Sequence, residues 1–369
     1  MKKIFALLSV FIVFVSAKEL NLGIIMPLTG ATAAYGQSAY EGIKLAHSMR
    51  SKLSNGDSVK LVVLDTKGDK IESATAATRL IAQDKVLGII GEMVTANTMQ
   101  AISVAESKKI PLIAPAATSD KLLNGKSYSA RVCFKDSFQG SSLAKYVFEK
   151  LHYKNVAIVI DQSTDYSLGL AKAFEGEFTQ KGGKILAKMK ISSGDKDYKA
   201  IIAQLKALKA DFIYLPVYYS EASLFVRQAR SAGLTTPMGS ADGTADESFI
   251  KLAGKASEGY IFTDSFDYAN PPTKLSHEFI ALYKKQKGAA EVPNFTAMGA
   301  DAYFVMFEAM QKCVNSLNSE CINNAIHSTS NFEGVSGVIS IDKSGNASRS
   351  LVLKEVKDGK QQYKDIINP

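Results

Sequence analysis

Short apolar runs alternate with longer amphipathic stretches along the first third of the chain. Four apolar runs of strand length predict β-strands at residues 20–26, 59–65, 86–90 and 110–114. Between them, apolar residues recur at helical spacing and predict helices at residues 39–53, 71–83 and 98–107. Strands that alternate with helices indicate a parallel sheet that is covered on both faces.

The same order of elements then begins a second time. The pattern predicts strands at 155–160, 184–191, 211–215 and 237–240, with helices at 169–180, 198–209 and 221–232. The segment NLGIIMPLTG leads to Tyr35 and a helix, just as NVAIVIDQST leads to Tyr166 and a helix. We therefore predict an α/β fold with two similar doubly wound parallel-sheet lobes, which are joined by a hinge that the chain crosses several times.

The N-terminal residues and the order of the elements predict a signal peptide and two lobes. Residues 1–17 combine a charged start, a short apolar run and a small-residue cleavage point near Ala17, as a secretory signal peptide does; a membrane anchor would need a longer apolar run. Removal of 17 residues leaves 352 of 369, more than one hydrophobic core usually serves. We expect lobe I at 18–136 plus 266–342 and lobe II at 137–265 plus 343–369, with crossings near Asp136, Ser265 and Asp342.

Composition and motifs narrow the classes of function. The net charge of +8 is spread along the chain without a basic block, and the chain contains no Trp, so a nucleic-acid partner is disfavoured. The four histidines are scattered, and no metal-binding or hydrolase motif is present. An enzyme, in the form of a cryptic hydrolase, is therefore only a remote alternative, and we expect no cofactor and no metal. Cys313 and Cys321 either form a disulfide or lie on a helix face, and Cys133 is expected to be a buried thiol.

Ligands of open parallel sheets bind beyond the carboxyl ends of the strands. In this chain those positions hold small, hydroxylated and aromatic residues: Tyr35, Met93, Val94, Thr95, Ala116, Ala117, Thr118, Tyr166, Tyr218 and Asp242. Thr95 and Thr118 offer hydroxyls, and each is suited to begin a helix whose free N–H groups attract an anion, whereas Asp242 suits a cation. A carboxylate held by one lobe and an ammonium held by the other describe an α-amino acid.

Each of these residues also has a purely structural interpretation. Thr95, Thr118 and Asp242 are common helix-capping residues, and single tyrosines are often found in a core or on a lobe surface. The binding interpretation therefore depends on their joint placement at strand ends in both repeats.

Four segments carry a resemblance to a known family. IPLIAPAATSD (110–120), FVRQARSAGL (225–234), DFIYLPVYYSEA (211–222) and YGQSAYEGIKLA (35–46) resemble the type I periplasmic binding proteins of branched-chain amino-acid ABC transporters. The resemblance implies a monomer in the periplasm that binds a branched-chain amino acid between two closing lobes. It would deliver the amino acid to membrane permease subunits and their ATPases.

The resemblance also implies individual roles. Thr95 and Thr118 would bind the ligand carboxylate, while the Ala116 carbonyl, Tyr218 and Asp242 would bind the ammonium. Tyr35, Tyr166, Met93, Val94 and Phe295 would line the side-chain pocket. The family often has Glu where this chain has Asp242, and we expect the additional charge of Glu92 to lie at the pocket rim. A binding protein of the same fold for an amide, urea or an aromatic acid, and a ligand sensor for a chemoreceptor, remain alternatives.

Overall fold

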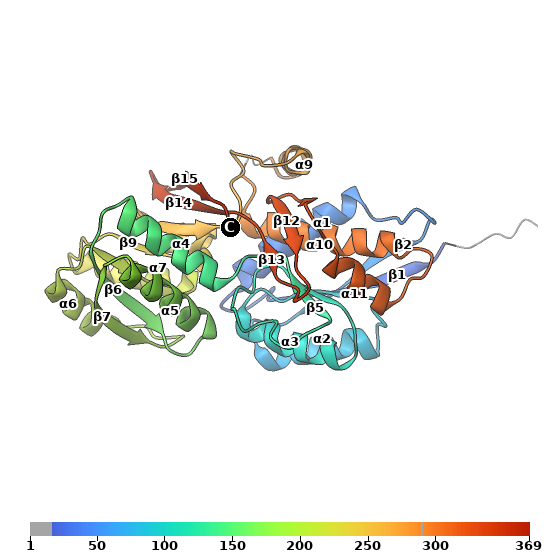
Figure 1. Ribbon diagram of the computed structural model, residues 1–369, viewed down its shortest axis with the longest axis horizontal. Coiled ribbons are helices and arrows are strands. Elements are labelled where there is room, and N and C mark those ends of the chain that lie inside the picture. Colours follow the sequence, from blue (N-terminus) through green and yellow to red (C-terminus); the bar gives the residue numbers. More distant parts are fainter. Residues whose placement is uncertain (1–16, 289–290) are drawn as a thin grey trace, which may run out of the picture.

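The computed structural model describes residues 17–288 and 291–369 (Figure 1). Its two large sheets lie at opposite ends of an elongated molecule, and the C-terminus lies between them. The predicted signal peptide, Ala17 apart, lies outside the described residues. Within the described part of the chain, no helix is both long enough and apolar enough to cross a bilayer.

The first sheet has five strands in the order β2-β1-β3-β4-β5, and all of its pairs are parallel. Its strands are β1 (Glu19–Met26), β2 (Ser58–Asp65), β3 (Ile89–Gly91), β4 (Leu112–Ala114) and β5 (Ser129–Arg131). The helices between them are α1 (Ala33–Met49), α2 (Lys70–Ala82) and α3 (Thr95–Ser107). Asp69 begins α2 because its side chain accepts the N–H groups of Ile71 and Glu72.

The second sheet repeats this order as β7-β6-β8-β9-β10 and then adds two antiparallel strands, β14 and β15. Its strands are β6 (Asn155–Asp161), β7 (Lys184–Ile191), β8 (Phe212–Tyr214), β9 (Met238–Ser240), β10 (Ile261–Asp264), β14 (Leu351–Lys357) and β15 (Lys360–Ile367). The helices of this part are α4 (Asp136–Glu149), α5 (Asp165–Gln180), α6 (Lys199–Leu208), α7 (Tyr219–Ser231), α8 (Glu247–Ala253) and the 3-10 turns η1 (Asp242–Thr244) and η2 (Gly254–Ser257). The repeated parallel sheets confirm the predicted fold class.

The last part of the chain returns to both sheets. It comprises α9 (Lys274–Lys287), α10 (Asn294–Lys312), α11 (Ser319–His327) and a small antiparallel sheet of β11 (Phe332–Glu333), β12 (Val338–Ile341) and β13 (Ala347–Ser348). A disulfide between Cys313 and Cys321 joins the end of α10 to α11, and Cys133 is a buried free thiol.

Several predicted boundaries were wrong. The first helix begins at Ala33 rather than residue 39 and ends at Met49 rather than 53, because small and polar residues at its start hide the apolar period. Helix α3 begins at Thr95 rather than residue 98, and α4 was not predicted.

The division into two lobes stays a prediction. Strand β13 pairs with β12, and the Gly345 carbonyl accepts the N–H of Arg131, so these contacts favour a third crossing nearer Arg349 than Asp342.

Helices α1 and α10 pack closely enough that glycine is needed on both. A Cβ atom on Gly42 would lie 1.8 Å from the Thr296 carbonyl oxygen, and one on Gly299 would lie 2.1 Å from that of Ala39. Helix α10 is buried on all sides along most of its length, since it packs on α1 and also contacts β3 and β4. This packing fixes the first turns of both helices relative to the sheet.

We expect Gly299→Ala to lower the free energy of unfolding by about 3 kcal/mol, at the upper end of overpacking effects, because backbone rather than a flexible side chain opposes the methyl group. Gly176→Ala on α5 is the matched control, since no atom of the described residues beyond its own stretch of helix lies within 4 Å of its Cβ position; it should stabilise the protein by about 0.5–1 kcal/mol through helix propensity. Urea unfolding of both variants measures this. Equal stability of the two variants would contradict the close helix contact.

Candidate functional site

One buried cavity lies where the carboxyl ends of strands from both large sheets meet. It is lined by Tyr35, Met93, Val94, Thr95, Ala116, Thr118, Tyr166, Tyr218, Asp242, Gly243 and Phe295. The first-sheet residues follow β3 and β4, and the second-sheet residues follow β6, β8 and β9. Helices α1 and α10 contribute Tyr35 and Phe295 from their first turns. The structure thus brings together every residue predicted for the site except Ala117.

Ala117 does not line the cavity. Its side chain is buried in an apolar cluster on the other side of the β4 loop, with Ile25 and Leu112 among its members. Its carbonyl oxygen accepts hydrogen bonds from Arg131 Nη1 at 3.2 Å and from Cys133 Sγ at 3.3 Å. Its neighbour Ala116 lines the cavity instead, because successive residues of extended chain face opposite ways.

The hydroxyls of Thr95 and Thr118 are buried, and neither has a hydrogen-bond partner at normal distance among the described residues. The Thr118 hydroxyl does lie near enough to the Asp136 carboxyl to oppose the rise in its pKa. Thr95 is the first residue of α3, and the helix cap is Val94, whose side chain cannot accept a hydrogen bond from the helix. Thr95 is therefore not a helix cap. Thr118 does not begin a helix, contrary to expectation, because β4 continues into a turn. A buried hydroxyl without a partner is costly, so both positions are suited to a polar ligand.

Asp242 supplies the carboxyl group of the cavity. Its Oδ1 accepts hydrogen bonds from Tyr166 Oη at 2.9 Å and from Gln139 Nε2 at 3.0 Å, and the residue is 5% exposed. Burial raises the pKa of this carboxyl to about 6, although the two hydrogen bonds oppose the shift. Above pH 6 the cavity therefore contains a negative charge that is largely shielded from water.

Gln139 supports Asp242, whereas the neighbouring carboxyl of Asp136 opposes its charge; neither residue was predicted as part of the site. Gln139 Nε2 also donates to Asp136 Oδ1 at 3.0 Å, while its Oε1 accepts from Thr263 Oγ1 at 2.8 Å. Burial, together with the charge of Asp242, raises the pKa of Asp136 well above its ordinary value. Both residues lie in the first turn of α4. The expectation that ligands bind beyond the carboxyl ends of strands therefore did not point to them.

Aromatic rings form most of the cavity wall. Tyr166 and Tyr218 stack with centroids 4.7 Å apart, and Tyr35 meets Phe295 edge to face at 4.9 Å. The Tyr35 hydroxyl donates to the Gly243 carbonyl at 2.5 Å and accepts the N–H of Tyr219 at 3.2 Å. Burial raises the pKa values of Tyr35, Tyr166 and Tyr218 well above their ordinary value, so these hydroxyls remain neutral.

Glu92 does not lie at the pocket rim, and that prediction was wrong. Its side chain is fully buried beneath the loop after β3. It accepts hydrogen bonds from Thr66 Oγ1 at 2.6 Å, from the N–H groups of Met93 and Val94 at 2.9 and 3.0 Å, and from Asn97 Nδ2 at 3.2 Å. Glu92 therefore holds the loop that carries two cavity residues, and it does not line the cavity.

The cavity is small and closed on several sides. Its volume is ≈ 10 Å³, about the space that one water molecule requires. Around it, Tyr219 Oη donates to the Ala31 carbonyl at 2.8 Å and Lys121 pairs with Asp165 at 3.3 Å, so segments from the two sheets touch. Access for a ligand requires these segments to separate. No Lys or Arg is among the described residues that line the cavity, and no metal-binding cluster occurs in residues 17–288 and 291–369.

Comparisons with known proteins find chains of similar sequence and similar fold. The chain is 30% identical over 259 residues to a Leu/Ile/Val-binding protein of Citrobacter freundii, covering 69% of this chain and 70% of that protein. A leucine binding protein from Thermotoga maritima has a similar structure, with a TM-score of 0.92 and 36% identity over 95% of this chain and 99% of that one.

A branched-chain amino-acid substrate binding protein from Streptococcus pneumoniae, solved with isoleucine, gives a TM-score of 0.90 and 29% identity over 95% of this chain and all of that one. Residues 19–361 match the family described as periplasmic binding protein. A match of this length, on a fold of two repeated parallel sheets, means that the chain belongs to the periplasmic binding protein family.

Proposed function

We propose that this protein binds a branched-chain L-amino acid between two closing lobes and delivers it to the permease and ATPase subunits of an ABC importer. The observation that carries the proposal is the polarity of the closed cavity. Two threonine hydroxyls without a hydrogen-bond partner among the described residues lie on the first-sheet side, and a buried carboxyl lies on the second-sheet side. An α-amino group and an α-carboxylate match these two sides.

The carboxylate side is supported by the start of α3. Its first N–H groups have no side-chain cap, and the positive end of the helix dipole attracts an anion. Thr95 at this helix start and Thr118 after β4 are the two side-chain donors. The absence of Lys and Arg from the described residues lining the cavity means that these neutral groups would bind the carboxylate.

The ammonium side is supported by Asp242, whose charge would be matched by the ligand. The Ala116 carbonyl and the Tyr218 hydroxyl would complete the set of acceptors. A urea, an amide or an aromatic acid has no ammonium and would leave Asp242 buried without an ionic partner, which disfavours the alternatives of the same fold. Met93, Val94, Tyr35 and Phe295 provide the apolar surroundings that an aliphatic side chain requires.

The match to the periplasmic binding protein family supports a place outside the cytoplasm, in the periplasm. We further propose that the protein acts as a monomer. A sensory role at a chemoreceptor would use the same site, and the two roles are compatible. Both roles require the lobes to separate so that a ligand can reach the closed cavity.

Thr118→Ala should weaken binding of leucine by about 1.5–3 kcal/mol, since it removes one hydrogen bond to a charged group. Asp242→Asn should weaken it further, because a buried ammonium would lose its ionic partner. Calorimetry on protein that was unfolded and refolded to remove bound ligand measures both effects. Wild-type affinity in Asp242→Asn would exclude Asp242 from the site.

Leucine affinity should fall as the pH is lowered from 7.5 to 5. The pKa of Asp242 is about 6 without ligand, so protons compete with the ammonium below that pH and the Kd should rise by up to about tenfold per pH unit. Asp242→Asn is the control and should show a much flatter profile, because an amide does not titrate and only the neighbouring Asp136 carboxyl remains. A flat wild-type profile would contradict an ion pair at this position.

Leucine and isoleucine should bind several-fold more tightly than valine, since each buried methylene contributes about 0.8 kcal/mol. Alanine should bind far more weakly, and lysine, arginine, aspartate and glutamate should not bind, because the cavity wall offers no partner for a second charge. Competition calorimetry with these amino acids gives the order directly. Tightest binding of a benzoate or of lysine would refute the proposed class of ligand.

A further inference from the structure

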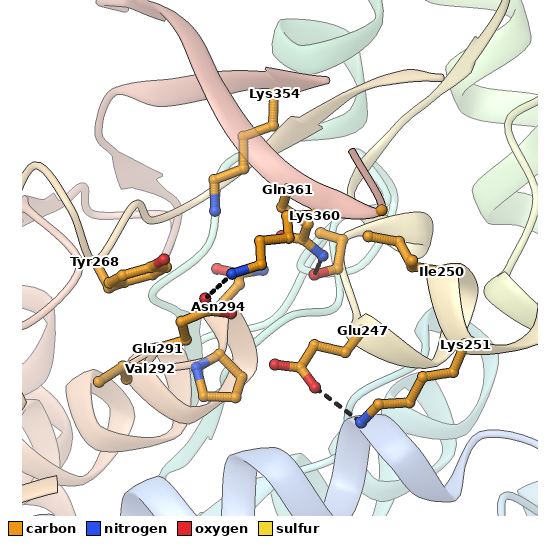
Figure 2. A pocket seen from close by; sticks show the side chains of 13 residues that line it. Glu247, Ile250, Lys251, Tyr268, Glu291, Val292, Asn294, Lys354, Lys360 and Gln361 are labelled. Atoms are coloured by element: carbon orange, nitrogen blue, oxygen red, sulfur yellow. Dashed lines mark hydrogen bonds and ion pairs between the residues drawn. The ribbon is translucent and has the colours of Figure 1, made fainter. Parts of the chain in front are cut away.

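The cavity that contains Tyr35, Thr118 and Asp242 is called the aromatic cavity below. A second cavity, of ≈ 250 Å³, is much larger (Figure 2). Its walls come from α8, from Tyr268 in the segment after β10, from residues 291–294 at the start of α10, and from β14 and β15 with the turn between them. Strand-end residues such as Thr118 and Asp242 do not line it. The two cavities are nevertheless neighbours, because Asn294 faces one and Phe295 the other.

The feature that suggests a ligand is the side chain of Asn294. This residue is 4% exposed, and both its Nδ2 and its Oδ1 lack a hydrogen-bond partner among the described residues. Figure 2 shows the side chain among those that surround the cavity. A buried carboxamide normally has partners for both its donor and its acceptor, so a molecule that presents one acceptor and one donor would complete it.

The surroundings favour a carboxylate as the acceptor. Helix α10 begins at Asn294 and has no side-chain cap and no acidic residue in its first turn, so its positive end is not neutralised locally. The Lys360 ammonium projects over the same helix start (Figure 2). Lys360 pairs with Glu291 at 3.8 Å, but both side chains are well exposed, so this contact is weak and its lysine is free to turn to a ligand.

The same surroundings favour an ammonium as the donor. Glu291 and Glu247 both line the cavity, and Tyr268 lies beside Glu291 (Figure 2). Glu247 already pairs with Lys251 at 2.8 Å, so Glu291 is the carboxylate that a ligand ammonium would meet. Lys354 also faces the cavity, but it is buried and already pairs with Asp264 at 2.8 Å and with Asp267 at 3.7 Å. Its charge is thereby matched, and it does not make the cavity a site for simple anions.

We propose that this cavity is a second binding site, which takes a small zwitterionic α-amino acid. The amide N–H₂ of Asn294 would donate to the ligand carboxylate, beside the start of α10 and Lys360. The amide oxygen of Asn294 would accept from the ligand ammonium, beside Glu291. The site is independent of the function proposed for the aromatic cavity, because no residue is shared between the two linings.

Calorimetry with glycine, L-serine and L-glutamine tests the proposal on the wild-type protein and on three variants. We expect at least one of these probes to bind, Asn294→Leu to weaken it by at least about tenfold, and Lys360→Ala to weaken it several-fold. Thr118→Ala should leave this affinity unchanged. Leu has the same number and branching of side-chain heavy atoms as Asn and removes both polar atoms, so Asn294→Leu is the closest apolar replacement, and a thermal melt checks that it folds. Lys360 is exposed, so Lys360→Ala gives a second test that does not depend on core packing.

Three results would overturn the proposal. The first is that none of the probes binds the wild-type protein at millimolar concentration. The second is that Thr118→Ala weakens the probes while Asn294→Leu and Lys360→Ala do not, which would place them in the aromatic cavity. The third is that Asn294→Leu changes only the association rate of leucine, which would make the second cavity an access route. A failure of leucine to bind at the aromatic cavity would refute the first function without affecting this one.

Discussion

The negative charge of Asp242 inside a nearly closed cavity is the constraint on which the rest of the site depends. Water does not stabilise it there, so its pKa is raised to about 6, and the Gln139 amide and the Tyr166 hydroxyl must stabilise it instead. A cationic group of a ligand would be its strongest partner. The neighbouring carboxyl of Asp136 increases the need for a cationic partner, because Asp136 and Asp242 are both buried and share the single amide nitrogen of Gln139.

The two sheets hold this charge opposite a neutral set of donors. The approach of α1 to α10 at Gly42 and Gly299 fixes Tyr35 and Phe295, and Tyr35 then reaches across to Gly243. Near the chain crossings, buried Arg349 donates to the carbonyls of Val132 and Ser265, so one side chain connects three distant segments. These contacts tie the segments near the crossings together, as the proposed binding between closing lobes would require.

Much of the site could be predicted because strand ends in a repeated α/β fold occupy known places. Thr95, Ala116 and Thr118 follow short buried strands, and Tyr218 and Asp242 follow their counterparts in the second repeat. Glu92 was misplaced because its position after β3 is the same whether its side chain faces the cavity or Thr66. Only the hydrogen bonds from Thr66, Asn97 and the next two N–H groups decide between these orientations.

The sequence by itself determined the alternation of strands and helices, their repetition, and the residue types at the strand ends, because these follow from hydrophobic period and chain order. The tertiary structure alone decided which of those residues meet. Gln139 lies 103 residues from Asp242, and Gly42 is separated by more than 250 residues from Thr296, so no local pattern records either contact. The amide of Asn294, which has no partner in the part of the chain that the structure describes, is likewise visible only once α8, α10 and β15 are placed around it, since burial is a property of packed segments and not of one stretch of chain.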